Sequence, residues 1–406
     1  MSAAKVGASA ASGVWRDLVG QEPTVEVLRG AVSAAATALH GDSGSPAAGT
    51  RSGGMTHAWL LTGPPGSGRS NAARAFAAAL QCPHGGCGEC LACRTALAGS
   101  HPDVSLVSTE RLSLGVDEVR ELVRRAAMSP TGDRWQVVVV EDADRLTERA
   151  ADALLKSVEE PATRTVWLLC APTAEDVVPT IRSRCRLLVL RTPPPAAVAQ
   201  VLTQRDGVSA EVATFAARAS QGHIGRARAL AGDEDTRNRR REVLGLPTRL
   251  RDLGACMTAA ANLVDAANEE AAPISARLDG TERSDLEQAL GMGTRGVKAR
   301  GTQGALKEME DQQKARGKRL QRDALDRALV DLMSFYRDVL VLQTGGGVDL
   351  VNEESRRDVE SVARAGTAES TVRRIQAILD CREALEGSVA PLLALEALMI
   401  ALARGR

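Results

Sequence analysis

A glycine-rich loop between an apolar run and a helical pattern limits what this chain can fold into more than any other feature. The loop GPPGSGRS spans residues 63–70, directly after an apolar run at 58–62 and before a helical pattern at 71–80. Strand, loop and helix in this order are the setting of a phosphate-binding P-loop, in which glycines let backbone N–H groups converge on phosphate oxygens at a helix N-terminus. The sequence therefore predicts a nucleotide-binding α/β core.

The expected phosphate contacts come from the whole loop. They are Gly63, Pro64, Pro65, Gly66, Ser67, Gly68, Arg69 and Ser70, with the Ser70 hydroxyl as a ligand of Mg²⁺. Arg69 departs from the pattern GxxxxGK[ST], because lysine is a compact point charge whereas arginine is larger and planar. We expect that ATP with Mg²⁺ can still bind through the backbone but that catalysis is impaired. A glycine-rich turn without any ligand is the alternative.

Short apolar runs rich in Val and Leu alternate with helical patterns from about Trp15 to Thr192, as in a parallel α/β sheet. The expected strands are 58–62, 104–107, 135–140, 166–170 and 187–190, and amphipathic helices are expected at 116–127 and 150–159. Five strands with crossover helices suit a doubly wound nucleotide-binding core.

An acidic pair follows the most apolar of these strands. Val137–Val140 leads into Glu141 and Asp142, which places two carboxylates at the carboxyl edge of the sheet beside the P-loop, as in a Walker B strand. The usual order is Asp before Glu, so Glu141 would take the metal side and Asp142 the water-activating side. Catalysis by positioning tolerates such a shift poorly. The alternative is a solvated turn or a helix cap, for which Asp144 is the candidate.

Four of the eight cysteines crowd into twelve residues. Cys82, Cys87, Cys90 and Cys93 are interleaved with glycines that permit tight turns, which predicts a closed, structural Zn²⁺ site with four thiolate ligands. His84 lies inside this knuckle and is expected to be merely exposed, because four sulfurs already saturate zinc. An iron–sulfur cluster and a disulfide are the less favoured alternatives.

The regions around this core are expected to differ in order and structure. We expect a disordered leader at 1–14, the nucleotide-binding core at 15–192, a helical domain at 193–245 and an all-helical domain at 246–406. The highly charged residues 269–322 indicate a flexible stretch or a solvated helix pair with a loose connection, centred on the Gly-rich residues 291–304.

Composition excludes some classes of protein. The chain carries 51 Lys+Arg and 51 Asp+Glu, so no global field favours nucleic acid or an anionic membrane, and 2% aromatic residues do not support base stacking. The start of the chain lacks the basic flank and apolar run of a secretory signal, and no apolar segment reaches the roughly 20 residues that span a bilayer. We therefore expect a cytosolic protein.

Several motifs occur together and resemble one family. The P-loop, the cysteine knuckle after its helix and the Val-rich strand are joined by LLKSVEEP at 154–161, SRC at 183–185, DLVGQ at 17–21 and HPD at 101–103. Together they resemble the AAA+ subunits of bacterial DNA polymerase III clamp loaders. The resemblance covers residues 15–230 by motif and the remainder by layout.

The resemblance implies a fold class, partners and a location. The fold would be an α/β AAA+ P-loop core with a five-stranded parallel sheet and a zinc knuckle, followed by a helical lid domain and an all-α collar domain. The partners would be delta and three gamma/tau subunits in a hetero-pentamer, with the sliding clamp and primer-template DNA engaged through the complex. The chain would act in the cytoplasm at the nucleoid-bound replisome, without membrane contact.

The resemblance also gives Arg184 a role. In such loaders the arginine of the SRC motif reaches the ATP of a neighbouring subunit, so Arg184 would be a trans-acting arginine finger that stabilises charge on the γ-phosphate. The alternative is an ordinary surface arginine, since Arg182 and Arg186 flank it and make the whole turn basic.

Departures from the family pattern indicate which kind of subunit this is. Arg69, the Glu141–Asp142 order and Gly225, where motor subunits carry a sensor arginine, all point away from a motor. The chain also ends at Arg406 without the long extension of a tau-type subunit. We expect a stator-like, non-polymerising subunit of the polymerase holoenzyme with weak or absent ATPase activity. An active gamma/tau-type ATPase, or a zinc-knuckle nucleic-acid-binding adaptor with a vestigial P-loop, are the alternatives.

Overall fold

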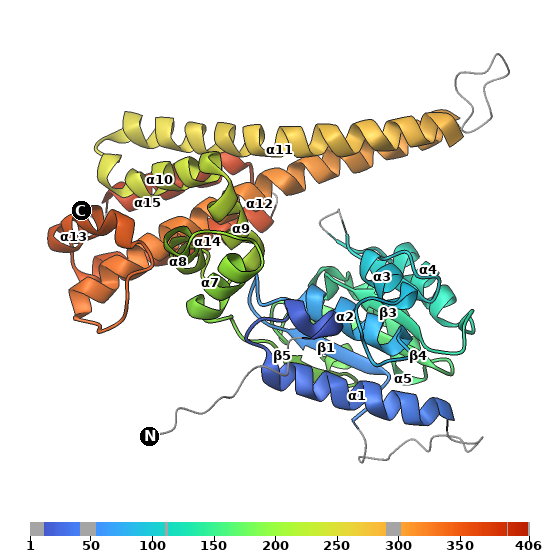
Figure 1. Ribbon diagram of the computed structural model, residues 1–406. Helices are drawn as coiled ribbons and strands as arrows, with labels where there is room; N and C mark the ends of the chain where they lie inside the picture. Colours follow the sequence, from blue (N-terminus) through green and yellow to red (C-terminus); the bar gives the residue numbers. More distant parts are fainter. Residues whose placement is uncertain (1–11, 41–53, 110–112, 290–301, 388, 405–406) are drawn as a thin grey trace, which may run out of the picture. The chain divides into compact units, whose positions relative to one another are not determined.

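The computed structural model of the chain describes residues 12–40, 54–109, 113–289, 302–387 and 389–404 (Figure 1). The chain divides into two compact units, residues 1–231 and residues 232–406, which we call unit 1 and unit 2. Each unit has its own hydrophobic core.

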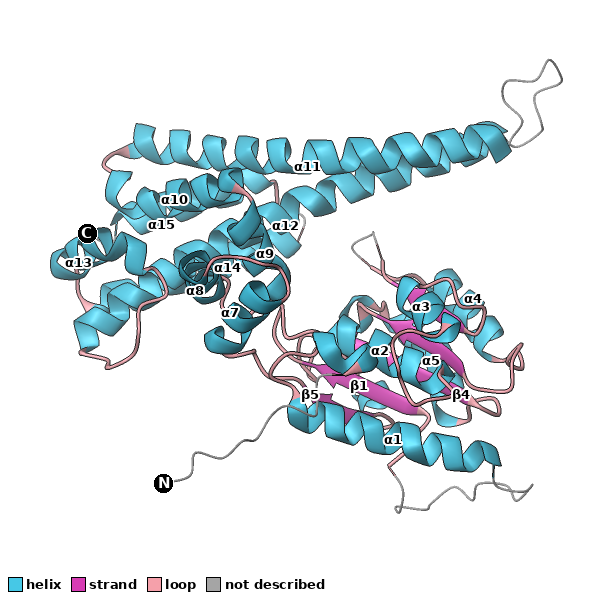
Figure 2. Ribbon diagram, in the orientation of Figure 1, coloured by secondary structure: helices cyan, strands magenta, loops and turns pink. Residues whose placement is uncertain are grey.

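Unit 1 is built on a five-stranded sheet with the strand order β2-β3-β4-β1-β5, in which every pairing is parallel (Figure 2). Its strands are β1 (Ala58–Thr62), β2 (Val104–Val107), β3 (Gln136–Val140), β4 (Thr165–Ala171) and β5 (Arg186–Val189). The five parallel strands predicted from the sequence are confirmed. The order places β1, with the P-loop at its carboxyl end, between β4 and β5.

Helices cover both faces of this sheet. On one face lie α1 (Glu22–His40), α2 (Arg69–Gln81) and α3 (Leu91–Ala98), and on the other lie α4 (Val116–Ala126), α5 (Glu148–Glu159) and α6 (Pro179–Arg182). Because successive side chains of a strand point to opposite faces, Trp59 and Leu61 join the first core whereas Ala58 and Leu60 join the second. Both faces of the strands are therefore buried.

Three helices follow the sheet within unit 1: α7 (Pro195–Gln204), α8 (Ala210–Ala219) and α9 (Ile224–Gly232). They enclose a small core of their own that includes Val198, Leu202 and Leu230. The next helix, α10 (Glu234–Arg249), places Val243 and Leu244 in the core of unit 2. The two compact units thus divide between residues 231 and 232, and the domain bounds expected from the sequence, 193–245 and 246–406, stay predictions.

The start of the described chain differs from the disordered leader expected at 1–14. Residues 1–11 lie outside the described residues, but Gly13–Asp17 form a 3₁₀ helix, η1, in which Val14 and Trp15 are buried. The Val14 N–H donates to the Gly86 carbonyl at 3.0 Å, within the cysteine knuckle. Val14 is ordered because its apolar side chain and its backbone both find partners there.

Unit 2 is entirely helical in its described part. After α10 it contains α11 (Leu253–Ala289), α12 (Thr302–Thr344), η3 (Glu353–Ser355), α13 (Arg356–Ala365), α14 (Ala368–Glu386) and α15 (Pro391–Arg404). α11 and α12 lie side by side as a long antiparallel pair (Figure 1). Among the described residues, none of the helices combines the length and the apolar character that crossing a bilayer requires.

The α11–α12 pair decides between the two alternatives for residues 269–322, a flexible stretch and a helix pair. The flexible stretch is wrong for 269–289 and 302–322, which are helical, whereas 290–301 lie outside the described residues. Charges satisfy one another across the pair: the buried Arg316 donates to Glu282 at 2.7 Å through Nη1, and Arg327 donates to Glu270 at 2.5 Å. A charged stretch can thus form ordered helices when its charges meet in register.

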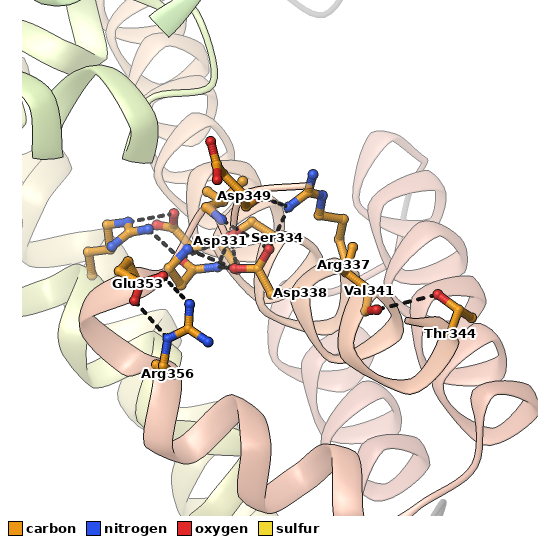
Figure 3. A network of polar contacts seen from close by, with 12 residues as sticks. Asp331, Ser334, Arg337, Asp338, Val341, Thr344, Asp349, Glu353 and Arg356 are labelled. Atoms are coloured by element: carbon orange, nitrogen blue, oxygen red, sulfur yellow. Dashed lines mark hydrogen bonds and ion pairs between the residues drawn. The ribbon is translucent and has the colours of Figure 1, made fainter. Parts of the chain in front are cut away.

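A buried polar network joins three segments of unit 2 (Figure 3). Arg240 of α10 donates to Asp331 of α12 at 3.2 Å and also to Asn352 and Glu354. Asn352 in turn donates to Asp338 of α12 from its backbone at 2.7 Å and from its side chain at 2.9 Å. The network ties α10 and the segment before α13 to α12.

Candidate functional site

The P-loop has the backbone that its sequence predicts. Gly63, Gly66 and Gly68 have φ of 155°, 84° and 90°, in the region that favours glycine, and α2 begins directly after Gly68. The loop therefore ends at a helix N-terminus, where unpaired N–H groups and the helix dipole favour an anion. All eight predicted loop residues lie between β1 and the first turn of α2.

Gln21 anchors the P-loop through hydrogen bonds of its side chain, a role that the sequence did not reveal. Its buried side chain donates from Nε2 to the Ser67 carbonyl at 3.2 Å and to the Arg191 carbonyl at 2.5 Å, and it accepts from the Arg191 N–H at 3.2 Å. One amide thus fixes the P-loop to the segment after β5. Its place in the motif at 17–21 was the only sequence signal.

His223 lies directly against the P-loop. A Cβ added at Gly66 would be 2.5 Å from the His223 Cβ, so the loop and the residue before α9 approach as closely as glycine allows. A Cβ at Gly225, the expected sensor position, would meet the His223 ring at 3.2 Å. The contact makes the start of α9 part of the surroundings of the loop.

The Arg69 side chain reaches toward the acidic edge of the sheet. Burial raises the pKa of Asp144, as does the nearby Asp142, while the positive charges of Arg145 and Arg69 oppose this rise. Burial also raises the pKa of Cys170 to about 12, with Glu141 adding to the effect and Arg69 opposing it. Arg69 Nη1 is buried and has no hydrogen-bond partner among the described residues. A buried guanidinium nitrogen without an acceptor fits an anionic oxygen.

The acidic pair after β3 is engaged within the chain. Glu141 Oε1 accepts from Arg74 Nε of α2 at 2.6 Å, and Asp142 Oδ2 accepts from the Thr109 N–H at 3.1 Å. The helix-cap alternative for Asp144 is wrong, because the N-cap of α5 is Thr147, whose side chain accepts from the Ala150 N–H. Asp144 lies instead in the short helix η2 (Ala143–Arg145).

These contacts decide which ligands the P-loop region fits. The loop backbone and the unsatisfied Arg69 nitrogen suit phosphate oxygens. The metal side is less suited to Mg²⁺, because the carboxylate expected to order the ion already has a cationic partner, Arg74. The residues present therefore fit a phosphate group but not a bound magnesium ion.

Arg184 lies away from the P-loop, in the exposed turn between α6 and β5. Its Nε donates to Glu159 Oε1 at the end of α5, and its Nη1 donates to the Thr180 carbonyl at 2.7 Å and to Ser183 Oγ at 3.2 Å. The Arg184 side chain is 37% exposed, and the Glu159 side chain is 44% exposed. Sequence reasoning placed Arg184 at the surface but missed its carboxylate partner.

The four knuckle cysteines come together as expected. Their Sγ atoms all lie within 4.8 Å of one another and could hold a metal ion, and all eight cysteines of the chain are free thiols. Each sulfur also accepts a backbone N–H. These bonds run from His84 and Cys87 to Cys82, from Cys90 to Cys87, from Cys93 to Cys90, and from Gly88 to Cys93, at 3.3–3.4 Å. The sulfurs are thus arranged and hydrogen-bonded as thiolate ligands are, and the disulfide alternative is wrong.

Electrostatics favours a thiolate in this knuckle. Burial disfavours the charged form of Cys82, but hydrogen bonds from the N–H groups of Cys87, Gly86 and His84 outweigh it and lower its pKa to about 6. Burial raises the pKa of Cys93. A divalent cation would favour the thiolate form of both Cys82 and Cys93, because it stabilises the charged form of each ligand. The donor set therefore fits a metal such as Zn²⁺, and His84 is exposed as expected.

Comparison with known proteins agrees with this geometry. The sequence family described as DNA polymerase III, delta subunit matches residues 47–194, which hold the P-loop, the knuckle and Arg184. The chain is 42% identical over 135 residues to DNA polymerase III subunit delta' of Pseudomonas aeruginosa, a match covering 32% of this chain and 41% of that protein. It is 37% identical over 180 residues to the delta' subunit of Escherichia coli, covering 43% of this chain and 54% of that protein.

A motor-type subunit is also similar. DNA polymerase III subunit gamma/tau of Mycobacterium tuberculosis is 33% identical over 169 residues, covering 40% of this chain and 29% of that protein. The matches to the two delta' proteins span about half of their length. Identity is higher to the delta' proteins than to gamma/tau, as the departures from the motor pattern predict. Residues 47–194 therefore match the family described as DNA polymerase III, delta subunit, and the similarity to delta' and gamma/tau proteins supports a clamp-loader subunit.

Proposed function

We propose that this chain is the delta-prime subunit of a cytoplasmic clamp loader, which donates Arg184 to ATP held by a neighbouring gamma/tau subunit. In this role it assembles with delta and three gamma/tau subunits and helps to load the sliding clamp onto primer-template DNA. Its own ATP hydrolysis is weak or absent. Helices α7–α9 act as the lid of the AAA+ core, and unit 2 acts as the collar.

One contrast carries the proposal. Arg184 is an exposed guanidinium in a surface turn, whereas Glu141, the carboxylate that a motor would use for its own metal, is paired with Arg74 inside the chain. A subunit with an outward arginine and an internally neutralised acidic edge is suited to act on a neighbour's nucleotide and not on its own.

The surface beside Arg184 supports a protein neighbour. Leu187 and Val189 on the edge strand β5 are 47% and 59% exposed. Leu187 pairs with Leu60 and so lies on the sheet face that α5 and α6 cover. Exposed apolar side chains next to a charged group are typical of interaction surfaces. The turn that carries Arg184 thus has the composition of a subunit contact.

The knuckle takes a structural role in this proposal. Four sulfur donors leave no coordination position for water, so a Zn²⁺ ion bound there would hold Cys82, Cys87, Cys90 and Cys93 together without taking part in a reaction. Because η1 packs on the same turn, the ion would also secure the first described segment of the chain.

Reconstitution with delta and gamma/tau subunits tests the function. Arg184→Ala should slow ATP hydrolysis at the neighbouring site by about 10³-fold or more. The loss would be seen in clamp loading and in that site's share of ATP turnover. Arg182→Ala, two residues away in the same basic turn, is the matched control and should retain both activities. Equal activity of the two variants would refute the finger.

The isolated chain distinguishes the alternatives. Robust DNA-stimulated hydrolysis by the wild type alone, not increased by Arg69→Lys, would indicate a gamma/tau-type motor. Tight binding of primer-template DNA by the isolated chain, without any effect on clamp loading, would indicate a nucleic-acid-binding adaptor.

A further inference from the structure

Glu159 binds the guanidinium of Arg184, which the proposed function has acting on the ATP of a neighbouring subunit. Arg184 Nε donates to Glu159 Oε1, and Nη2 forms an ion pair with the same oxygen. Nη1 is engaged as well, with the Thr180 carbonyl and Ser183 Oγ. All three nitrogens of the guanidinium therefore have acceptors within the chain.

We infer that Glu159 holds Arg184 in a resting position, and that a phosphate of the neighbouring subunit's ATP displaces the carboxylate when the subunits meet. The inference rests on the proposed function, because it assumes that Arg184 serves a nucleotide in trans. It adds a positioning residue, Glu159, which competes with the phosphate for the same guanidinium.

The geometry of arginine recognition makes the two acceptors exclusive. A guanidinium binds a carboxylate or a phosphate most strongly through two parallel N–H donors. The Nε–Nη2 edge of Arg184 is directed at Glu159, and Nη1 is directed at Thr180 and Ser183. A two-donor contact with phosphate therefore requires at least one of these acceptors to be released. Glu159 is the acceptor whose charge opposes an incoming phosphate.

The place of Glu159 in its helix favours an exchangeable pair. Glu159 is the last residue of α5, where the negative end of the helix dipole disfavours a carboxylate. The helix end is held in place, because His57 Nε2 and the Val158 carbonyl are 2.8 Å apart. In the described part of the chain, the Glu159 side chain has no partner other than Arg184. The carboxylate is thus presented to Arg184 by a fixed helix end.

The exposure of the pair sets the size of the effect. Both side chains are more than a third exposed, so water screens the attraction and the pair is weak. When only a fraction of a protein is in its binding-competent state, the apparent affinity for the ligand is reduced by that fraction. Removing the competing charge should therefore raise kcat/KM for ATP by roughly two- to five-fold, the range that corresponds to an exposed ion pair.

The test uses the reconstituted complex of this chain with delta and gamma/tau subunits. Glu159→Gln keeps the size of the side chain and removes its charge, and Glu160→Gln makes the same change at the adjacent exposed residue. We expect Glu159→Gln to raise kcat/KM for ATP by roughly two- to five-fold and Glu160→Gln to leave it unchanged. Thermal unfolding of each variant controls for folding.

A double-mutant cycle separates this inference from the proposed function. In an Arg184→Ala background, Glu159→Gln should have no effect, because there is no guanidinium to release. If Arg184→Ala impairs the complex but Glu159→Gln leaves kcat/KM unchanged or lowers it, the resting-position inference fails and the finger survives. If Arg184→Ala has no effect, both fail. A gain that persists without Arg184 would also overturn the inference.

Discussion

Arg74 and Glu141 form an ion pair, with 2.6 Å between Nε and Oε1, at the edge of the sheet where a nucleotide-bound metal would be expected. The Glu141 side chain is 13% exposed, so the pair is partly shielded from water. Arg69 lies near the same acidic edge. Two arginine side chains thus lie at the acidic edge of the sheet.

The first prediction concerns the metal dependence of nucleotide binding. Because Arg74 already neutralises Glu141, ATP affinity of the isolated wild-type chain should change less than about threefold between EDTA and excess Mg²⁺, whereas Arg74→Met should show a change of about tenfold, ~1.4 kcal/mol. Fluorescent ATP titrations measure both. Arg149→Met on the exposed face of α5 is the control for loss of one positive charge. Strong Mg²⁺ dependence of the wild type would contradict the prediction.

The second prediction concerns metal at the knuckle. Purified protein should contain one zinc per chain by elemental analysis, and Cys87→Ser should lose it because a ligand is missing. Cys185→Ser, outside the knuckle, should retain it. Chelation should also release η1, since its Val14 is bonded to the Gly86 carbonyl of the knuckle turn. Increased proteolysis around residues 12–17 would report this release, and a chelated protein with an unchanged cleavage pattern would not fit.

The third prediction concerns the contact between the P-loop and α9. Gly66→Ala places a Cβ 2.5 Å from the His223 Cβ at a residue with φ of 84°. Gly207→Ala is the matched control, because its φ is 68° but nothing lies within 4 Å of the added Cβ. Both variants carry a backbone cost of about 1–2 kcal/mol. Gly66→Ala should lose about 1–3 kcal/mol more, the usual cost of overpacking.

The tryptophans make this measurable. All four tryptophans of the chain, Trp15, Trp59, Trp135 and Trp167, belong to unit 1. Their fluorescence during urea unfolding therefore reports the unit that contains both substitutions. Equal destabilisation by the two variants would show that His223 moves aside without cost.

The sheet and the cluster of four cysteines were predictable because their signals are local. Runs of Val and Leu bounded by turns gave all five strands to within a residue at each end, since a strand buried on both faces reads as a continuous apolar run. The knuckle followed from the spacing of its cysteines and glycines alone. The P-loop backbone was likewise fixed by the glycines at 63, 66 and 68.

The ion pairs on which the two proposals rest were not predictable from local pattern. Arg74 meets Glu141 at the carboxyl ends of the strands, and Glu159 meets Arg184 at their amino ends, only because crossover connections bring separate helices and loops together. A charged residue in one helix does not reveal its partner in another. The same limit applies to α10, whose helical pattern gave no indication that its apolar side chains join unit 2.

The buried network of unit 2 gives a fourth prediction. Arg240 is 4% exposed, and its three partners include Asp331, also 4% exposed. Arg240→Met keeps most of the side-chain volume but leaves a buried carboxylate without its cation, which should cost about 3–5 kcal/mol of unfolding free energy. Arg241→Met, at the adjacent exposed residue, should cost less than about 0.5 kcal/mol.

Tyr336 can follow this loss separately from unit 1. It is the single tyrosine of the chain and is buried in the core of unit 2, whereas the tryptophans report unit 1. In urea, Arg240→Met should shift the tyrosine absorbance transition to lower denaturant and leave the tryptophan fluorescence transition in place. If both Arg240→Met and Arg241→Met unfold like the wild type, the network contributes no stability, and Asp331 is then compensated by its other neighbours.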